Sequence, residues 1–181
     1  MNVTVEEDDE NYSIYECLYS RNYPGWSEKL EEHKSAILQL SNLIEKKEKE
    51  FGKFYPLKEN IFKALEMTPL DKVKIVIWGQ DPYPTLLDNG KPRAQGYSFG
   101  VDKTDQVPQS LKNIYKEIKD NFPTFSSPDH GDLTWLANQG ILFMNQSLTF
   151  CPANPKLYLN LWNRFTYIII KILNENVEGC I

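Results

Sequence analysis

Two polar side chains of this chain stand where apolar runs end, at positions suited to chemistry. Asp81 follows the run Val73–Trp78 after a short turn, and Asn145 closes the run Ile141–Asn145. A carboxylate can orient a water molecule and stabilise a neighbouring positive charge, and a carboxamide offers both a donor and an acceptor. The simpler readings are an Asx-type turn at Asp81, ahead of Pro82, and an Asn145 side chain that bonds a nearby loop.

The elements around these residues predict an α/β domain. Both apolar runs are typical of strands, and the run Val73–Trp78 is apolar on both faces, as in buried parallel strands. Helical spacing and capping residues indicate helices from Ser27, after Pro56, over Pro108–Asn121, over Asp132–Gln139 and through Trp162–Ile172, and Gly179–Ile181 should approach a further strand. Strands alternating with helices favour a parallel sheet. Ligands bind beyond the carboxyl ends of such strands, so Asp81 and Asn145 should face one crevice.

The charge of the chain is unevenly distributed. The net charge is −5, which by itself argues against nucleic-acid binding. Residues 1–16 hold six acidic and no basic residues, which leaves 20 basic and 19 acidic residues in the rest of the chain. We therefore expect residues 1–25 to form an acidic, disordered tail, and residues 26–181 to form one near-neutral domain that can bind DNA through a local site.

Several classes of protein are disfavoured by composition. No apolar run reaches the ~20 residues of a membrane helix, and no signal-peptide pattern opens the chain. Three widely spaced cysteines and two histidines argue against a zinc site and fit a reducing compartment. We expect an intracellular protein of the nucleus or cytoplasm that is not secreted, does not bind membranes, is a monomer, and holds no metal and no cofactor.

Gly79-Gln-Asp-Pro-Tyr83 resembles the water-activating motif of the family 1 uracil-DNA glycosylases. Further matching segments follow in the family's order and near its spacing: Tyr55–Phe62, Gly96–Phe99, Pro108–Leu111, His130–Leu133 and Gln139–Thr149. The resemblance covers about residues 26–181. It implies a three-layer αβα sandwich with a central parallel sheet. It also implies hydrolysis of the N-glycosidic bond of deoxyuridine in DNA, the step that starts base-excision repair.

The resemblance also implies roles for individual residues at a base flipped out of the duplex. Asp81 is the catalytic carboxylate, and backbone N–H groups near Gln80 and Asp81 point at uracil O2. Asn145 reads the base edge, and Phe99 stacks on the base. Tyr83 fills the space that the methyl group of thymine needs, so the wrong base is rejected by a clash.

The remaining carried-over residues concern DNA and structure. Pro108 and Ser110 resemble the loop that holds a DNA phosphate, although a serine near a helix start is commonly a cap. His130 falls in a segment that is structural in the family. The expected partners are uracil-containing DNA, single- or double-stranded, and replication or repair proteins.

The chain also departs from the family. Pro84 stands where many members have histidine, and the loop after it is longer and more charged than usual. Members continue past the position that matches Ile181, through a His-Pro-Ser-Pro-Leu motif. Three readings stay open: a fragment of an active enzyme, a truncated inactive relic, or a non-catalytic protein that binds DNA or replication partners. A nucleotide-binding α/β protein is disfavoured, because no glycine-rich loop follows Val73–Trp78.

Overall fold

The computed structural model describes residues 12–179. Its elements are, in chain order, α1 (Ile14–Tyr19), α2 (Trp26–Glu31), α3 (Lys34–Phe51), the short 3-10 turn η2 (Lys58–Asn60), α4 (Lys63–Met67), the turn η3 (Leu70–Lys72), β1 (Ile75–Gly79), α5 (Gln109–Asn121), α6 (Thr134–Ala137), β2 (Ile141–Asn145) and α7 (Asn163–Asn176). Over the described range, no helix combines the length and the apolar character that crossing a membrane requires.

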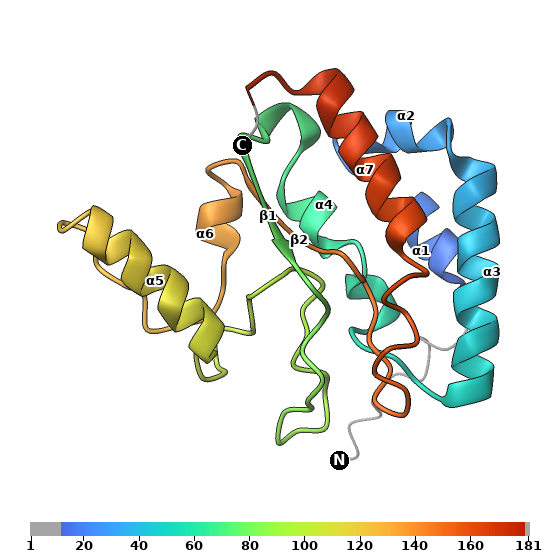
Figure 1. Cartoon of the computed structure of the whole chain (residues 1–181), viewed down its shortest axis with the longest axis horizontal. Helices are drawn as coiled ribbons and strands as arrows, with labels where there is room; N and C mark the ends of the chain where they lie inside the picture. The colour runs from blue at the N-terminus through green and yellow to red at the C-terminus, as the bar shows by residue number, and fades with distance from the viewer. Residues whose placement is uncertain (1–11, 180–181) are drawn as a thin grey trace, which may run out of the picture.

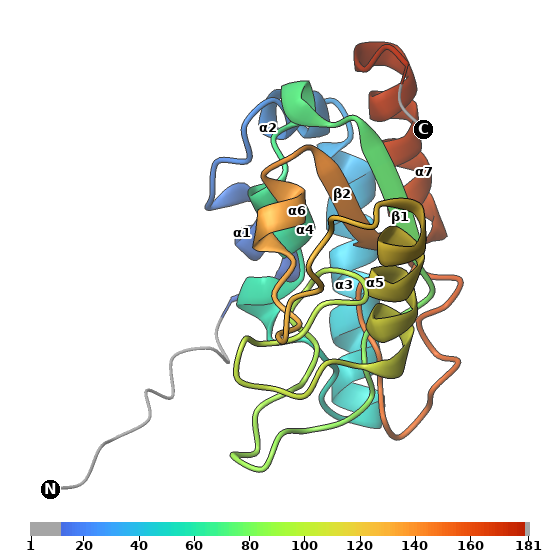
Figure 2. The same cartoon turned by 90° about the vertical axis from the view of Figure 1, so that its left-hand side faces the viewer.

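The strands β1 and β2 lie side by side in parallel, in a register that pairs Ile75 with Ile141 and Gly79 with Asn145. Helices cover both faces of this pair (Figure 1). Viewed from the side of α5, α5 and α6 lie in front of the strands and the other helices lie behind (Figure 2). The α/β class and the three-layer arrangement expected from the sequence are therefore confirmed, with a sheet of two strands within residues 12–179.

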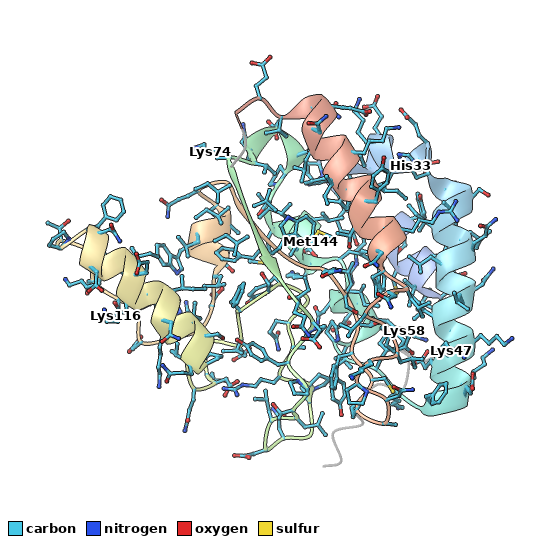
Figure 3. All side chains as sticks on the ribbon, in the orientation of Figure 1. His33, Lys47, Lys58, Lys74, Lys116 and Met144 are labelled. Carbon is cyan, nitrogen blue, oxygen red and sulfur yellow. The ribbon has the colours of Figure 1, made fainter. Side chains whose placement is uncertain are left out.

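Side-chain alternation along β2 divides the core in two. Leu142 and Met144 point into a larger cluster with helices α1–α4 and α7, and Met144 lies in this interior in Figure 3. Phe143 points the other way, into a smaller cluster with Leu111 and Tyr115 of α5. Each face of the strand is thus buried against its own helical layer, which is the pattern expected of a central parallel strand.

The predicted start of the domain at residue 26 is too late. Ser13 caps α1 through a capping box with Glu16, and Ile14 and Leu18 of this helix are each only 2% exposed within the main core. Tyr23 is buried as well. Apolar side chains at helical spacing hold this segment against the domain despite its acidic neighbourhood. The rest of the expected tail, residues 1–11, lies outside the described residues.

Two further expectations need correction. The helix expected from Ser27 is broken after Glu31, and α3 begins at Lys34. The strand β1 is less buried than its composition suggests, because Ile75 and Trp78 are 38% and 36% exposed. The strands at β1 and β2 and the helices at α5 and α7 are confirmed near their predicted positions. The strand approach predicted at Gly179–Ile181 falls mostly outside the described residues.

Candidate active site

A cavity of about 190 Å³ opens at the carboxyl ends of β1 and β2. It is lined by Gly79, Gln80, Asp81, Pro82, Tyr83, Ala94, Gly96, Tyr97, Phe99, Ser110 and Asn145. The structure therefore brings together six of the seven residues that the sequence singled out. The seventh, Pro108, does not line the cavity; it is buried at the start of α5.

Asn145 lies opposite Gly79, with which it is paired in the register of the two strands. A β carbon added to Gly79 would lie 2.2 Å from Oδ1 of Asn145, so only glycine leaves room for the amide there. Asn145 is 6% exposed. Among residues 12–179 its side chain has no hydrogen-bond partner. A buried amide without a protein partner is costly, so its donor and acceptor are available to a ligand in the cavity.

The turn after β1 is anchored and still keeps free donors. The N–H groups of Gln146 and Ser147 donate to the carbonyls of Gly79 and Gln80, each at 2.9 Å, which extends the strand pairing past the strand ends. The N–H groups of Gln80 and Asp81 meet no acceptor within the described part of the chain. A rigid turn with free N–H groups beside a cavity is suited to stabilising a developing anion.

Asp81 is partly buried at the cavity wall. Burial raises the pKa of its carboxyl group above the usual range, because removal from water disfavours the charged form. Its side chain makes no hydrogen bond or ion pair with another described residue. The carboxylate is therefore free to accept a hydrogen bond from a water molecule or a ligand.

Phe99 has φ of 64°, the left-handed region that side chains other than glycine rarely adopt. Gly100 N–H donates to Ser98 O at 2.8 Å, which closes a tight γ-turn around Phe99. Ser98 is tied to both strands, since its N–H donates to Phe143 O and its hydroxyl donates to Ile77 O, each at 3.3 Å. The fold holds Phe99 in a strained backbone conformation that places it at the cavity, and such strain is characteristic of functional positions.

Tyr83 connects three segments of the wall. Its hydroxyl donates to Phe99 O at 3.1 Å and lies 3.0 Å from Oγ of Ser110. Because the tyrosine proton goes to Phe99, Ser110 is the donor to Tyr83. Ser110 thus serves the cavity wall, and it makes no capping bond at the start of α5. Burial raises the pKa of Tyr83, so it stays protonated as this network requires.

The sequence did not single out Ala94, Gly96 and Tyr97 as site residues, although two of them belong to a quoted segment. Gly96 has φ of 83°, and a β carbon there would lie 1.6 Å from Asn60 O. Only glycine at this position allows the chain to pass so close to η2. His130 does not line the cavity; its carbonyl accepts a bond from Tyr115 at 3.2 Å, consistent with a structural segment.

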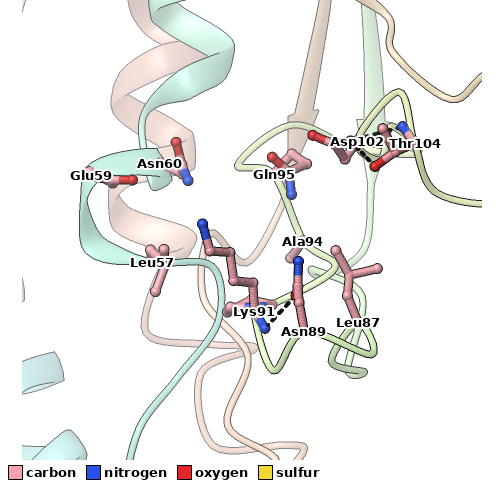
Figure 4. Close-up of a pocket in the computed structure, with 11 residues that line it drawn as sticks. Leu57, Glu59, Asn60, Leu87, Asn89, Lys91, Ala94, Gln95, Asp102 and Thr104 are labelled. Carbon is pink, nitrogen blue, oxygen red and sulfur yellow. Dashed lines mark hydrogen bonds between the residues drawn. The ribbon is translucent and has the colours of Figure 1, made fainter. Parts of the chain in front are cut away.

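A neighbouring cavity of about 300 Å³ shares Ala94 with the first (Figure 4). Polar side chains of Asn60, Lys91 and Gln95 reach into it. Its wall carries charges of both signs and includes none of the site residues expected from the sequence. The cavity at the strand ends, with an aromatic wall and the unpaired buried amide of Asn145, is the one that suits a flat polar ring.

The fold and cavity define an α/β domain with a pocket of about 190 Å³ at the strand ends. No protein-family model matches the chain. The uracil-DNA glycosylase of Aliivibrio fischeri is 38% identical over 152 residues, which span 83% of this chain and 66% of that protein. The uracil-DNA glycosylase of Dichelobacter nodosus is 44% identical over 125 residues, spanning 68% of this chain and 52% of that protein.

Solved structures agree with these relatives. The crystal structure of mimivirus uracil-DNA glycosylase superposes with a TM-score of 0.81 at 29% identity, over 90% of this chain and 59% of that one. A variant of the mimivirus protein in complex with UGI gives 0.80 at 30% identity, over 90% and 60% of the two chains. This chain belongs to the uracil-DNA glycosylase family. It spans between about half and two thirds of the length of these relatives.

Proposed function

We propose that this chain carries the uracil-recognising and water-positioning part of an enzyme that hydrolyses the N-glycosidic bond of deoxyuridine in DNA. The observation that carries the proposal is the convergence of Asp81, Tyr83, Phe99 and Asn145 on one cavity, in a member of this family. These residues come from three separate segments of the chain. The substrate is uracil-containing DNA, with the base turned out of the helix into the pocket.

Recognition of the base rests on Asn145 and Phe99. The side-chain amide of Asn145 has both a donor and an acceptor free, which matches O4 and N3–H of uracil. Phe99 also lines the cavity and offers a flat surface for stacking on the base. Cytosine presents an amino group and an unprotonated nitrogen at the same positions, so a fixed amide orientation disfavours it.

Rejection of thymine rests on Tyr83. Its ring is held through the hydroxyl by Phe99 O and Ser110 Oγ. Thymine differs from uracil by a methyl group at C5, and a fixed ring in that place excludes it by a clash. A clash discriminates more strongly than a difference in hydrophobic contact, because one methyl group changes the binding free energy in a hydrophobic pocket only slightly.

Bond cleavage rests on Asp81 and the turn that carries it. The ionised carboxylate orients a water molecule towards C1′ of the sugar and stabilises the positive charge that develops there. The water oxygen bonds to C1′ as the C1′–N1 bond breaks, the proton that the water loses passes to the Asp81 carboxylate, and the bonding electrons leave with uracil as an anion. The free N–H groups of Gln80 and Asp81 are suited to receive that charge at O2.

An excision assay tests this function. The full chain, in stoichiometric excess over a single-stranded oligonucleotide with one uracil, should release uracil and leave an alkali-labile site. Asp81→Asn should slow release on the order of 100-fold or more. Asp88→Asn is the matched control, because Asp88 is exposed on the loop after the site and should leave the rate unchanged. Absence of product from a folded wild-type sample would contradict the proposed function for this chain.

A further inference from the structure

The loop after Tyr83 is folded into a hairpin. Leu86 and Pro92 form an antiparallel bridge, and Leu87 N–H donates to Lys91 O at 2.8 Å. Arg93 N–H donates to Thr85 O at 3.0 Å and closes the base of the hairpin. This hairpin returns Arg93 to the neighbourhood of Tyr83.

The guanidinium of Arg93 is fixed by three hydrogen bonds from two of its nitrogens. Nε lies 2.5 Å from Oδ2 of Asp105, and Nη2 lies 3.3 Å from Oδ1 of the same carboxylate. Nη2 also donates to Gln106 O at 2.7 Å. The Arg93 and Asp105 side chains are only 24% and 12% exposed. A two-point ion pair that is largely withdrawn from water holds the plane of the guanidinium in one orientation.

This fixed guanidinium lies over the ring of Tyr83, 5.6 Å from the ring centre. The hydroxyl of the same tyrosine is bound by Phe99 O and Ser110 Oγ. Tyr83 is therefore held at both ends, by a cation on the face of its ring and by hydrogen bonds at its hydroxyl. Exclusion of a methyl group by a clash works only if the excluding ring cannot swing aside.

We propose that Arg93, held by Asp105, is a positioning residue that sets the selectivity of the site for uracil over thymine by immobilising the Tyr83 ring. This inference rests on the proposed function of the cavity. Arg93 does not line that cavity and acts only through Tyr83. The hairpin thereby gains a role in specificity, and Asp105 gains one through its bond to Arg93.

The test compares Arg93→Ala, Arg93→Lys and Asp105→Asn with the wild-type full chain. We expect Arg93→Ala to lower the ratio of uracil to thymine excision about tenfold, with a smaller loss of the rate on uracil. Arg93→Lys should recover only part of the ratio, because an ammonium cannot form the two-point pair. Asp105→Asn should act in the same direction. Arg164→Ala is the control, since this exposed arginine of α7 bonds Gln39 and no other residue within 12–179.

A second readout does not depend on activity. Nuclear magnetic resonance spectra of ¹³C-labelled tyrosine rings provide it, and Tyr83→Phe identifies the Tyr83 signal. In Arg93→Ala, this signal should move towards the signal of an exposed ring such as that of Tyr167. An unchanged Tyr83 signal together with an unchanged excision ratio would overturn the inference. If the wild type releases no uracil, the proposed function fails, and the ring signal alone still decides whether Arg93 holds Tyr83.

Discussion

Gly79 and Asn145 are opposite one another at the ends of two parallel strands, and the side chain of Asn145 occupies the place where Gly79 would carry a β carbon. A β carbon there would lie 2.2 Å from Asn145 Oδ1 and 2.7 Å from the β carbon of Ser98. Asn145, which we expect to read the base, can therefore occupy its position only because the first residue of the Gly79–Tyr83 motif is glycine. A local motif and a distant asparagine are parts of one arrangement.

Gly79→Ala should displace the amide of Asn145. Overpacking at this point should cost about 1–3 kcal/mol of unfolding free energy. Loss of a hydrogen-bonding contact to the base should lower uracil excision roughly tenfold or more. Gly52→Ala is the control for stability alone, since Gly52 has φ of 94° and nothing within 4 Å of its β position. Urea unfolding and excision rates separate the two effects, and equal rates for Gly79→Ala and wild type would refute the packing argument.

The raised pKa of Asp81 predicts how activity responds to pH. The carboxylate must be ionised to orient water, so kcat/KM should fall as pH drops through this raised pKa. The decline should begin at a higher pH than the ordinary aspartate value of about 3.9 would give. A pH–rate profile with its acid limb at or below that value would count against Asp81 as the essential carboxylate.

The same pKa shift predicts a gain in stability for Asp81→Asn. The folded chain holds the Asp81 proton more tightly than the unfolded chain, so ionisation at neutral pH disfavours folding. The variant should therefore melt at a higher temperature than wild type at neutral pH. The difference should shrink as pH falls through the raised pKa and vanish below the unfolded value of about 3.9. Thermal melts across this pH range provide the measurement. If Asp81→Asn melted at a lower temperature than wild type at neutral pH, burial of Asp81 would not destabilise its ionised form as expected.

Tyr83→Phe and Tyr83→Ala should separate the two tasks of this residue. Tyr83→Phe loses the bonds to Phe99 O and Ser110 Oγ, at a cost of about 1 kcal/mol of stability, and keeps the bulk that excludes thymine. Tyr83→Ala removes that bulk and should release thymine from DNA. Chromatography of the released bases checks this prediction. If Tyr83→Ala remained specific for uracil, Tyr83 would not exclude thymine by a clash.

Phe99 offers a test of backbone strain. Glycine tolerates φ of 64° and alanine does not, so Phe99→Gly should be more stable than Phe99→Ala by about 1 kcal/mol. Both variants lose the stacking surface and should bind uracil more weakly than wild type. Denaturant unfolding of the pair measures the difference. If Phe99→Ala is the more stable of the two, the γ-turn does not store the strain assigned to it.

The elements that carry the site could be predicted because their signals are local. Apolar runs predicted β1 and β2, and the abrupt change from apolar to polar residues at the end of each run indicated that Asp81 and Asn145 lie at strand ends. The helix α1 escaped prediction because Ile14 and Leu18 lie next to an acidic stretch, and their burial depends on packing against the rest of the domain. The break in the helix after Glu31 could not be predicted, because no glycine or proline stands there.

The side-chain network around Tyr83 could not be predicted from spacing. Ser110 follows a proline at a helix start, a context that favours a cap or a phosphate contact, and only the fold shows its bond to Tyr83. Arg93 and Asp105 are separated by 12 positions and lie outside the helices and strands, so only the fold shows their pairing. Such pairs are products of tertiary packing, and no sequence period encodes them.

The claim that this chain forms a pocket that selects uracil is tested most directly by titrating the full chain with the free bases. In nuclear magnetic resonance spectra, uracil should shift the side-chain amide signals of Asn145 in a saturable manner. Thymine at the same concentrations should leave them in place, and Asn145→Ala should abolish the response of the remaining cavity residues to uracil. Equal responses to the two bases, or none to uracil, would contradict the account.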